Sequence, residues 1–313
     1  MKQHEWKRRA VEHFGSLEAE QRVFTREQIG RLLNERRPEL GIPKTLSVER
    51  FLGVLFAEGR MRKVKIPPEA VSEQESTSAN PPRPQDRGYR AFERYVWGEA
   101  SPYEVALSLR GGSYLSHASA ALLHGLADDD PDTIYTNKEQ SAKPPPRGPL
   151  TQEGIDRAFA NHPRSSNYVF RYEGKRIVLL NGKQSQNLGV EPVVVPFGPP
   201  LLATGLERTL IDLTVRPAYA GGVMGVLAAY RHARGKVSVD ALLTILGKLQ
   251  FVYPYHQAVG LYLKLADYSG PELQKLRTAP RRFDFYLAHH MDNPDFDPEW
   301  RVYYAGELRR KTK

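Results

Sequence analysis

A polar, proline-rich segment divides this chain and limits how it can fold. Residues 69–88 include the string SEQESTSANPPRPQDRG, which has almost no apolar side chains and is rich in Ser and Pro. Such a segment buries too little surface to offset the entropy lost when it is ordered. We therefore predict a head at 1–68, a linker at 69–90 and a larger body at 91–313.

Two amphipathic helices are predicted at the start of the head. In the first, from about Gln3 to Phe14, apolar side chains recur on one stripe, and Gly15 is expected to end it. The second begins after Thr25, which has capping-box spacing with Gln28, and is expected to end near Arg36 because Pro38 follows.

A third helix and a strand complete the predicted head. The turn PELGIPKT leads to a helix that Thr45 or Ser47 can cap, with Gly59 as its left-handed stop. The string RMRKVKI then alternates apolar and basic residues with the period of a strand. Three short helices followed by a basic strand are typical of a winged helix-turn-helix.

The positive charge of the chain is concentrated in this head. The whole chain carries a net charge of +9, and residues 1–66 hold 15 Lys and Arg against 9 Asp and Glu, which gives +6. A local positive field attracts a polyanion with closely spaced phosphates. Pattern and charge together predict that the head binds double-stranded DNA.

Candidate DNA-binding residues follow from the geometry of that motif. The N-terminal part of the third helix is expected to enter the major groove, the second helix to brace the backbone, and the basic strand to act as the wing. The residues expected to contact DNA are Arg26, Arg31, Lys44, Thr45, Ser47, Arg50, Arg60, Arg62, Lys63 and Lys65.

The body is predicted to mix helices and strands, so the fold class is α+β. Thr204 and Glu207 have capping-box spacing at the start of one helix. The helices are expected at 91–97, 103–109, 117–124, 153–160, 206–213, 222–233, 239–249 and 254–267. The strands are expected at 167–172, 176–180 and 192–197, with short apolar-aromatic segments at 283–288 and 300–304.

The body lacks the common catalytic motifs. It has no GxxxxGK[ST] loop, no GxGxxG after a strand, no GxSxG and no HExxH, and the chain has no Cys. One alternative is a metal-dependent nuclease that uses Asp132 with Glu173 and Lys175 in an E-x-K pattern. We expect Glu173-Gly174-Lys175 to be a hairpin tip instead, which does not hold a metal.

Histidines and clustered acids offer no clear metal site either. His117 and His124 lie two helical turns apart, which is too far for one zinc ion, and His289 and His290 are adjacent and so face apart. The run of Asp residues around Asp129 is typical of a solvated loop. We therefore expect no enzyme, no metal and no cofactor.

Several longer strings resemble those of a known family. In order along the chain they are PYEVALSLRGGSYLSHASAALLHGL, TQEGIDRAF, GLERTLIDLTVRPAYAGG, FVYPYHQAVGLYL and FDFYLAHHM. Together with the predicted winged helix, they resemble the AbiEi-type antitoxins of bacterial type IV toxin–antitoxin systems, across most of the chain from Tyr95 onward.

The resemblance implies a function and two partners. Proteins of this kind repress their own operon by binding operator DNA, and they oppose a co-encoded AbiEii-type nucleotidyltransferase toxin. It implies no catalytic residues. Arg208 and Arg216 could present charge to such a toxin or to RNA. The apolar runs are too short to cross a bilayer, and we expect a cytoplasmic protein without a membrane partner. A protein-interaction module without DNA binding remains the other alternative.

Overall fold

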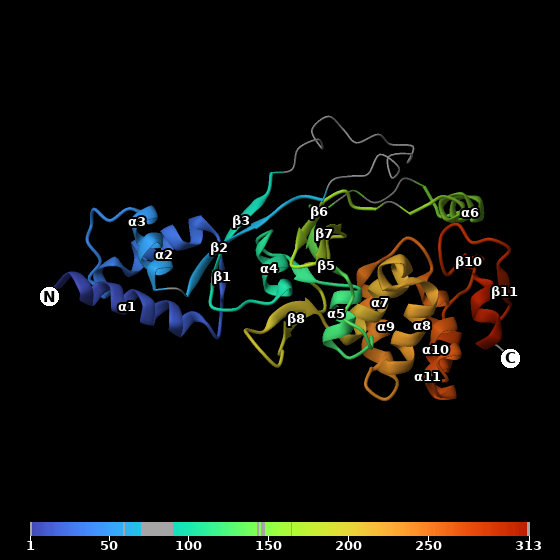
Figure 1. Ribbon diagram of the computed structural model, residues 1–313. Coiled ribbons are helices and arrows are strands. Elements are labelled where there is room, and N and C mark those ends of the chain that lie inside the picture. Colours follow the sequence, from blue (N-terminus) through green and yellow to red (C-terminus); the bar gives the residue numbers. More distant parts are fainter. Residues whose placement is uncertain are drawn as a thin grey trace. The chain divides into compact units, whose positions relative to one another are not determined.

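The computed structural model describes residues 2–58, 60–69, 90–142, 144, 148–163 and 165–311. The fold is α+β, as predicted (Figure 1). The chain forms two compact units. The first unit comprises residues 1–113, 167–178 and 192–201, and the second comprises 114–166, 179–191 and 202–313.

Three helices begin the first unit. They are α1 (Lys2–Leu17), α2 (Arg26–Leu40) and α3 (Val48–Ala57). Helix α1 continues through Gly15, so the predicted stop at that residue is wrong. Helix α2 continues past Pro38 and ends at Gly41, whose φ of 67° is the left-handed conformation of a helix cap. Pro38 cannot donate to the carbonyl four residues before it, and the helix ends within three residues of it.

The predicted helix starts are confirmed by the capping contacts. The Thr25 hydroxyl accepts from the Gln28 N–H, and the Gln28 side chain accepts from the Thr25 N–H at 2.7 Å, which completes the capping box. The Ser47 side chain caps α3 by accepting from the Arg50 N–H. Gly59, the predicted stop of α3, lies outside the described residues.

A three-stranded sheet joins these helices, in the order β1-β3-β2. Strand β1 is Val23–Phe24, β2 is Met61–Ile66, as predicted, and β3 is Phe92–Trp97. Strands β2 and β3 pair antiparallel along their whole length, from Met61 opposite Trp97 to Ile66 opposite Phe92. The helix predicted at 91–97 is therefore wrong, because the bulky residues of FERYVW pair with a strand.

Strand β3 also supplies part of the head's core. Tyr95 and Trp97 are buried in one cluster with side chains of all three helices, and the Trp97 ring lies 5.4 Å from that of Phe14. The first unit thus continues beyond the proline-rich segment to residue 113. This division differs from the predicted boundary at 69–90, most of which lies outside the described residues.

Helix α4 (Pro102–Ser108) and a hairpin complete the first unit. Ser101 and Glu104 form a capping box at the start of α4. The hairpin joins β6 (Val169–Tyr172) to β7 (Lys175–Gly182). Its turn residues Glu173 and Gly174 have φ of 45° and 78°, both positive as in a type I′ turn, so the predicted hairpin tip is confirmed.

The strand predicted at 192–197 is shorter than expected. Strand β8 spans Val190–Val193, and the residues after it leave the sheet. Val194 and Phe197 are 82% and 88% exposed, so their apolar character does not reflect a buried strand.

The second unit is built around a sheet with the order β7-β5-β4-β9. Strands β4 (Tyr114–Leu115), β5 (Thr133–Glu139) and β9 (Leu201–Thr204) are joined by an antiparallel β4–β5 ladder and a parallel β4–β9 ladder. A separate small sheet has the order β10-β12-β11. Its strands are β10 (Phe285–Tyr286), β11 (Asp295–Asp297) and β12 (Val302–Tyr304).

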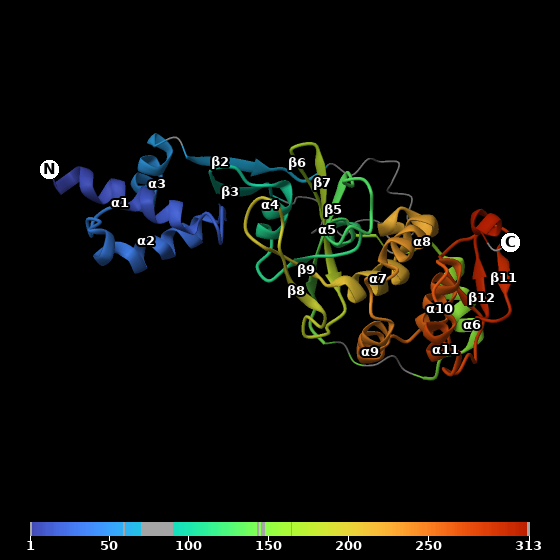
Figure 2. The same ribbon diagram turned by 90° about the horizontal axis from the view of Figure 1, so that it is seen from below.

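Most helices of the second unit lie close to the predicted ranges (Figure 2). They are α5 (Ala118–Leu123), α6 (Gln152–Ala160), α7 (Leu206–Val215), α8 (Gly222–Ala233), α9 (Val239–Leu249) and α10 (Tyr255–Leu265). Helix α11 (Gly270–Arg277) and the 3-10 turns η3 (Pro217–Ala220) and η4 (Gly306–Lys311) are not predicted from the sequence. Of the helices described, none has the length and apolar content needed to cross a membrane.

The second predicted capping box is wrong. Gly205, not Thr204, is the N-cap of α7, and no side chain caps it. The Thr204 hydroxyl instead shares a 2.8 Å hydrogen bond with that of Thr209, and the Glu207 carboxylate accepts from the Ser238 N–H. Thr204 is part of a strand here, so its backbone cannot serve the helix start.

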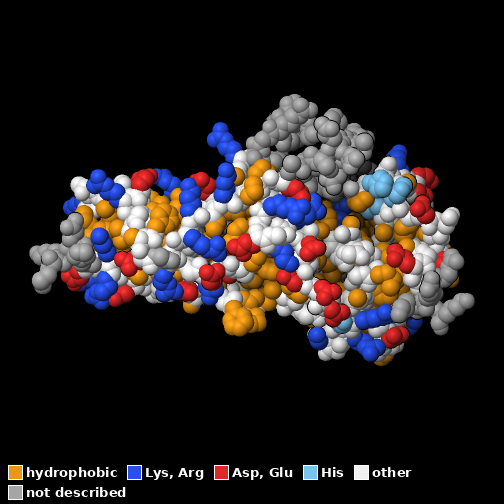
Figure 3. Space-filling view, in the orientation of Figure 1, with side chains coloured by type: hydrophobic (Ala, Val, Ile, Leu, Met, Phe, Trp, Pro, Cys, Tyr) orange, Lys and Arg blue, Asp and Glu red, His pale blue; other side chains and the backbone are white. Residues whose placement is uncertain are grey.

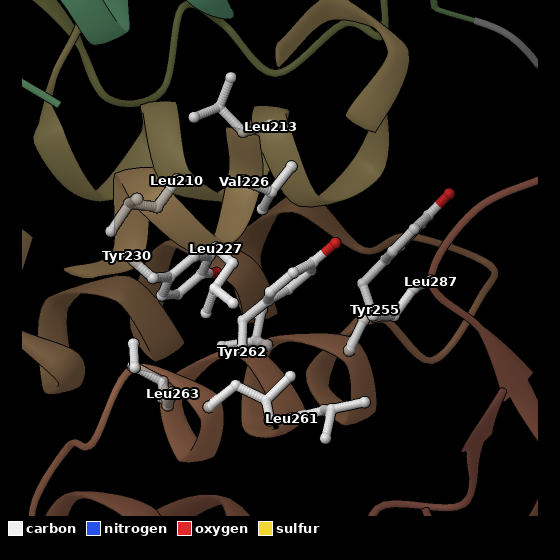
Figure 4. Close-up of a cluster of buried hydrophobic side chains, with 14 of the residues drawn as sticks. Leu210, Leu213, Val226, Leu227, Tyr230, Tyr255, Leu261, Tyr262, Leu263 and Leu287 are labelled. Carbon is white, nitrogen blue, oxygen red and sulfur yellow. The ribbon is translucent and has the colours of Figure 1, made fainter. Parts of the chain in front are cut away.

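The core of the second unit lies between α7, α8 and α10 (Figure 4). The rings of Tyr230 and Tyr262 stack at 5.3 Å among buried leucines and valines. Gly260 of α10 permits a close approach of a large side chain: a Cβ added there would lie 2.2 Å from the ring of the fully buried Trp300.

We predict opposite effects for two glycine substitutions in these helices. Gly260→Ala should lower the free energy of unfolding by about 1–3 kcal/mol, because the Trp300 ring cannot move away from the added methyl group. Gly247→Ala, at an exposed position of α9 with nothing within 4 Å, should raise it by about 0.5–1 kcal/mol through helix propensity. Urea denaturation measures both, and equal effects would contradict the packing at Gly260.

Candidate nucleic-acid interface

The start of α3 presents several of the predicted DNA-binding residues. Lys44, Thr45, Ser47 and Arg50 lie in the turn before the helix or in its first turn, and both cations among them are exposed. The first N–H groups of a helix have no partner within the helix, and they favour an anion. Ser47 satisfies one of these groups, at Arg50. The remaining arrangement places two cations at a helix start that itself favours phosphate.

Arg37, for which the sequence predicts no role, stabilises this turn. Arg37, near the end of α2, donates to the Pro43 carbonyl at 2.6 Å and to the Leu46 carbonyl at 2.8 Å. A guanidinium offers several donors in a fixed plane, so it can hold two carbonyls at a defined spacing. Arg37 thereby fixes the path of the chain from α2 into α3. The sequence gives little sign of this role, because Arg37 is one of several basic residues in the same helix.

The two predicted phosphate-contacting residues of α2 are paired with carboxylates. Arg26 forms an ion pair with Glu49 on the first turn of α3. Arg31 lies 3.7 Å from Glu27, one turn earlier on α2. The first pair connects the two helices, and both lower the net charge offered by this face.

The basic strand β2 and Arg60 before it are also paired with acids. Arg60 binds Glu18 at 2.8 Å, and Arg62 lies 3.7 Å from Glu99 and 3.6 Å from Glu173. Lys63 binds Glu93 of β3 at 2.8 Å, and this hydrogen bond raises the pKa of Lys63, so its ammonium remains charged. The sequence alone predicts none of these pairings.

Three predicted cations have no such partner. In the part of the chain that is described, no ion pair involves Lys44, Arg50 or Lys65. Figure 3 shows Lys and Arg side chains interleaved with Asp and Glu on the visible face. Exposed ion pairs contribute only about 0–1 kcal/mol, so a phosphate can replace a carboxylate in them at small cost. Lys44, Arg50 and Lys65 can bind a phosphate without first releasing a carboxylate.

Glu173, the acid of the E-x-K pattern, is paired with an arginine. The Glu173 carboxylate faces Arg62, so it is neutralised by a cation at the hairpin tip. Among the described residues, no group of three or more His, Cys, Asp or Glu side chains is arranged to hold a metal ion.

The predicted histidine candidates have local partners. The His124 ring bonds the Thr204 carbonyl at 2.7 Å, and the His289 and His290 rings bond carbonyls at the end of α6. His117 bonds the Ser116 hydroxyl at 2.9 Å. Each of the four rings thus makes at least one contact that fixes its position in the second unit.

Comparisons with known proteins reach the fold and no further. No protein-family model matches the sequence, and a search of curated proteins finds no match. A solved structure is similar, described as the crystal structure of the RV2827C protein from Mycobacterium tuberculosis. The TM-score is 0.53 at 18% sequence identity, and the match covers 98% of this chain and 95% of that one. At this identity the likeness concerns the fold alone.

We predict that Arg37 and its neighbour Arg36 differ in their contribution to stability. Arg37→Met keeps most of the apolar stem but removes two charged hydrogen bonds to carbonyls, and it should lower the free energy of unfolding by about 1–3 kcal/mol. Arg36→Met removes only a surface ion pair with Glu39 and should cost about 0–1 kcal/mol. Urea denaturation distinguishes the two, and a larger decrease for Arg36→Met would refute the assigned role of Arg37.

Proposed function

We propose that this protein is a DNA-binding autorepressor and antitoxin of a type IV toxin–antitoxin system, without enzymatic activity. In this proposal α1, α2, α3 and the β2–β3 ribbon act as a winged helix-turn-helix on operator DNA. The second unit opposes a co-encoded AbiEii-type nucleotidyltransferase toxin.

The observation that carries the DNA-binding part is the start of α3. Lys44 and Arg50 are exposed and free of carboxylate partners in the described chain, and they flank the helix end whose N–H groups favour phosphate. The turn that carries them is held by Arg37. A preorganised turn lowers the ordering cost of binding.

The β2–β3 ribbon supports the assignment of a wing. It follows α3 directly in the chain and carries Lys63 and Lys65 on exposed positions of β2. In a winged helix, such a ribbon reaches the backbone or the neighbouring groove beside the recognition helix. Lys65 has no ion pair in the described chain, so we assign it the stronger contact.

The antitoxin part rests on the resemblance of the longer strings. In the structure these strings form α4, β4, α5, α6, α7, α10 and β10, and many of their apolar residues are buried. Buried positions specify packing, so the resemblance bears on the fold of this part more than on any one contact with a toxin. No observation favours the nuclease alternative, since Arg62 neutralises Glu173.

Titration with duplex DNA at several salt concentrations tests the proposal. The probe is the DNA immediately upstream of the gene, and binding of the full chain is followed by fluorescence anisotropy. Lys44→Ala with Arg50→Ala should weaken binding and reduce the slope of log affinity against log salt by about 2, one for each phosphate that the variant no longer neutralises. Lys63→Ala is the matched control, and its effect should be smaller because Glu93 already neutralises Lys63.

The same variants separate the two activities in cells. The Lys44→Ala, Arg50→Ala chain should no longer repress a reporter but should still protect cells that express the co-encoded toxin. Failure of the wild-type chain to bind the duplex in dilute buffer would overturn the DNA-binding part. Failure of the wild-type chain to protect cells would overturn the antitoxin part.

A further inference from the structure

Arg216 is a half-buried cation in the second unit that lacks an acidic partner. It lies between α7 and η3, where the Tyr219 N–H donates to its carbonyl at 2.9 Å. Within the described chain, its guanidinium makes no ion pair and no hydrogen bond. The other arginine of this segment, Arg208, is bonded to Asp212 at 2.9 Å. A guanidinium with several donors and little water is poised to bind an anion.

Three aromatic rings gather at the turn that carries this arginine, since Tyr219 belongs to that turn. The centroid of Tyr219 lies 4.8 Å from that of Tyr135 and 5.1 Å from that of His117, and the His117 ring meets Tyr219 edge-on. Tyr135 and Tyr219 are both half-buried. Such a group offers aromatic surface beside the guanidinium.

His117 is held in an unusual backbone conformation at this place. Its φ of 53° and ψ of −133° are rare for a residue with a side chain, and such conformations persist where the surroundings impose them. Burial lowers the pKa of His117 to about 4, so the ring is neutral at pH 7. We assign the Ser116 hydroxyl as donor to Nδ1, which leaves the ring proton on Nε2. The ring then presents an N–H donor without adding charge.

The positive charge of Arg216 also affects the pKa of two tyrosine hydroxyls. Burial raises the pKa of Tyr255 and of Tyr219, and Arg216 opposes both increases. Figure 4 shows the Tyr255 hydroxyl pointing away from the hydrophobic cluster. His117, Tyr219 and Tyr255 are thus all near enough to Arg216 for its charge to act on them. Asp212 is the acid whose charge also reaches His117, and it is already bonded to Arg208.

We propose that Arg216, His117 and Tyr219 form a binding site for the phosphate of a nucleoside phosphate. The guanidinium, the imidazole N–H and the phenol would donate to phosphate oxygens, and the rings of Tyr135 and Tyr219 would contact the base. This site lies in the second unit and goes beyond the proposed function, which assigns no small ligand to the protein.

Binding of nucleoside triphosphates by the full chain tests this proposal. Isothermal titration calorimetry with ATP, GTP, CTP and UTP, without added metal, gives the affinity of each. At least one should bind, and Arg216→Ala should weaken it about tenfold or more, since the variant cannot make the charged hydrogen bond to the phosphate. Arg234→Ala is the matched control, because Arg234 is an exposed arginine of the same unit that donates to the Asp267 carbonyl. Its affinity should equal that of the wild type.

Further arms distinguish the phosphate from the base. Tripolyphosphate should bind more weakly than the best nucleotide, and Tyr219→Leu should reduce this difference while circular dichroism shows an unchanged fold. Absence of binding by all four nucleotides at millimolar concentration would overturn the proposal. So would equal binding by wild type and Arg216→Ala, or equal binding of tripolyphosphate and nucleotide. Because DNA binding is measured separately on Lys44 and Arg50 variants, failure here leaves the proposed function untouched.

Discussion

The pairing of β2 with β3 is the interaction on which the first unit depends. It joins residues 61–66 to residues 92–97, on opposite sides of the proline-rich segment, through six aligned residue pairs. Strand β3 is central in its sheet, since β1 pairs with its other edge. It also brings Tyr95 and Trp97 into the core formed by the three helices. Without it, β2 would have no partner and the helices would lack two large aromatic side chains.

Ion pairs decide which Lys and Arg side chains of the basic head can bind another anion. The excess of Lys and Arg in residues 1–66 gives the net charge of the head, but it does not show which of these cations are unpaired and free to bind a phosphate. Arg62 faces two acids and Lys63 one, whereas Lys44 and Arg50 face none in the described chain. Lys44 and Arg50 lie at the start of α3, which follows a turn held by Arg37. The same reasoning, applied to the second unit, distinguishes Arg216 from Arg208.

Several local signals in the sequence predict local structure correctly, whereas the stop at Gly15 and the capping box at Thr204 do not. The caps at Thr25 and Ser47, the strand RMRKVKI and the tip at Glu173-Gly174 each follow from neighbouring residues, and each is confirmed. Strand β3 is mistaken for a helix because a short apolar-aromatic segment fits either state until its partner strand is known. The exposure of Lys44 and Arg50 can be expected from their place at the start of a helix. The pairing of Arg62 with Glu99 and Glu173 cannot be expected, because these acids approach Arg62 only in the tertiary fold.

Unfolding of a fragment of residues 1–68 tests the dependence on β3 most directly. The fragment contains Trp6, whose fluorescence reports on the helical core, and it can be studied with and without a synthetic peptide of residues 90–100. The account predicts no cooperative urea transition for the fragment alone, and recovery of a transition when the peptide is added. A cooperative transition of the fragment that the peptide does not change would contradict it.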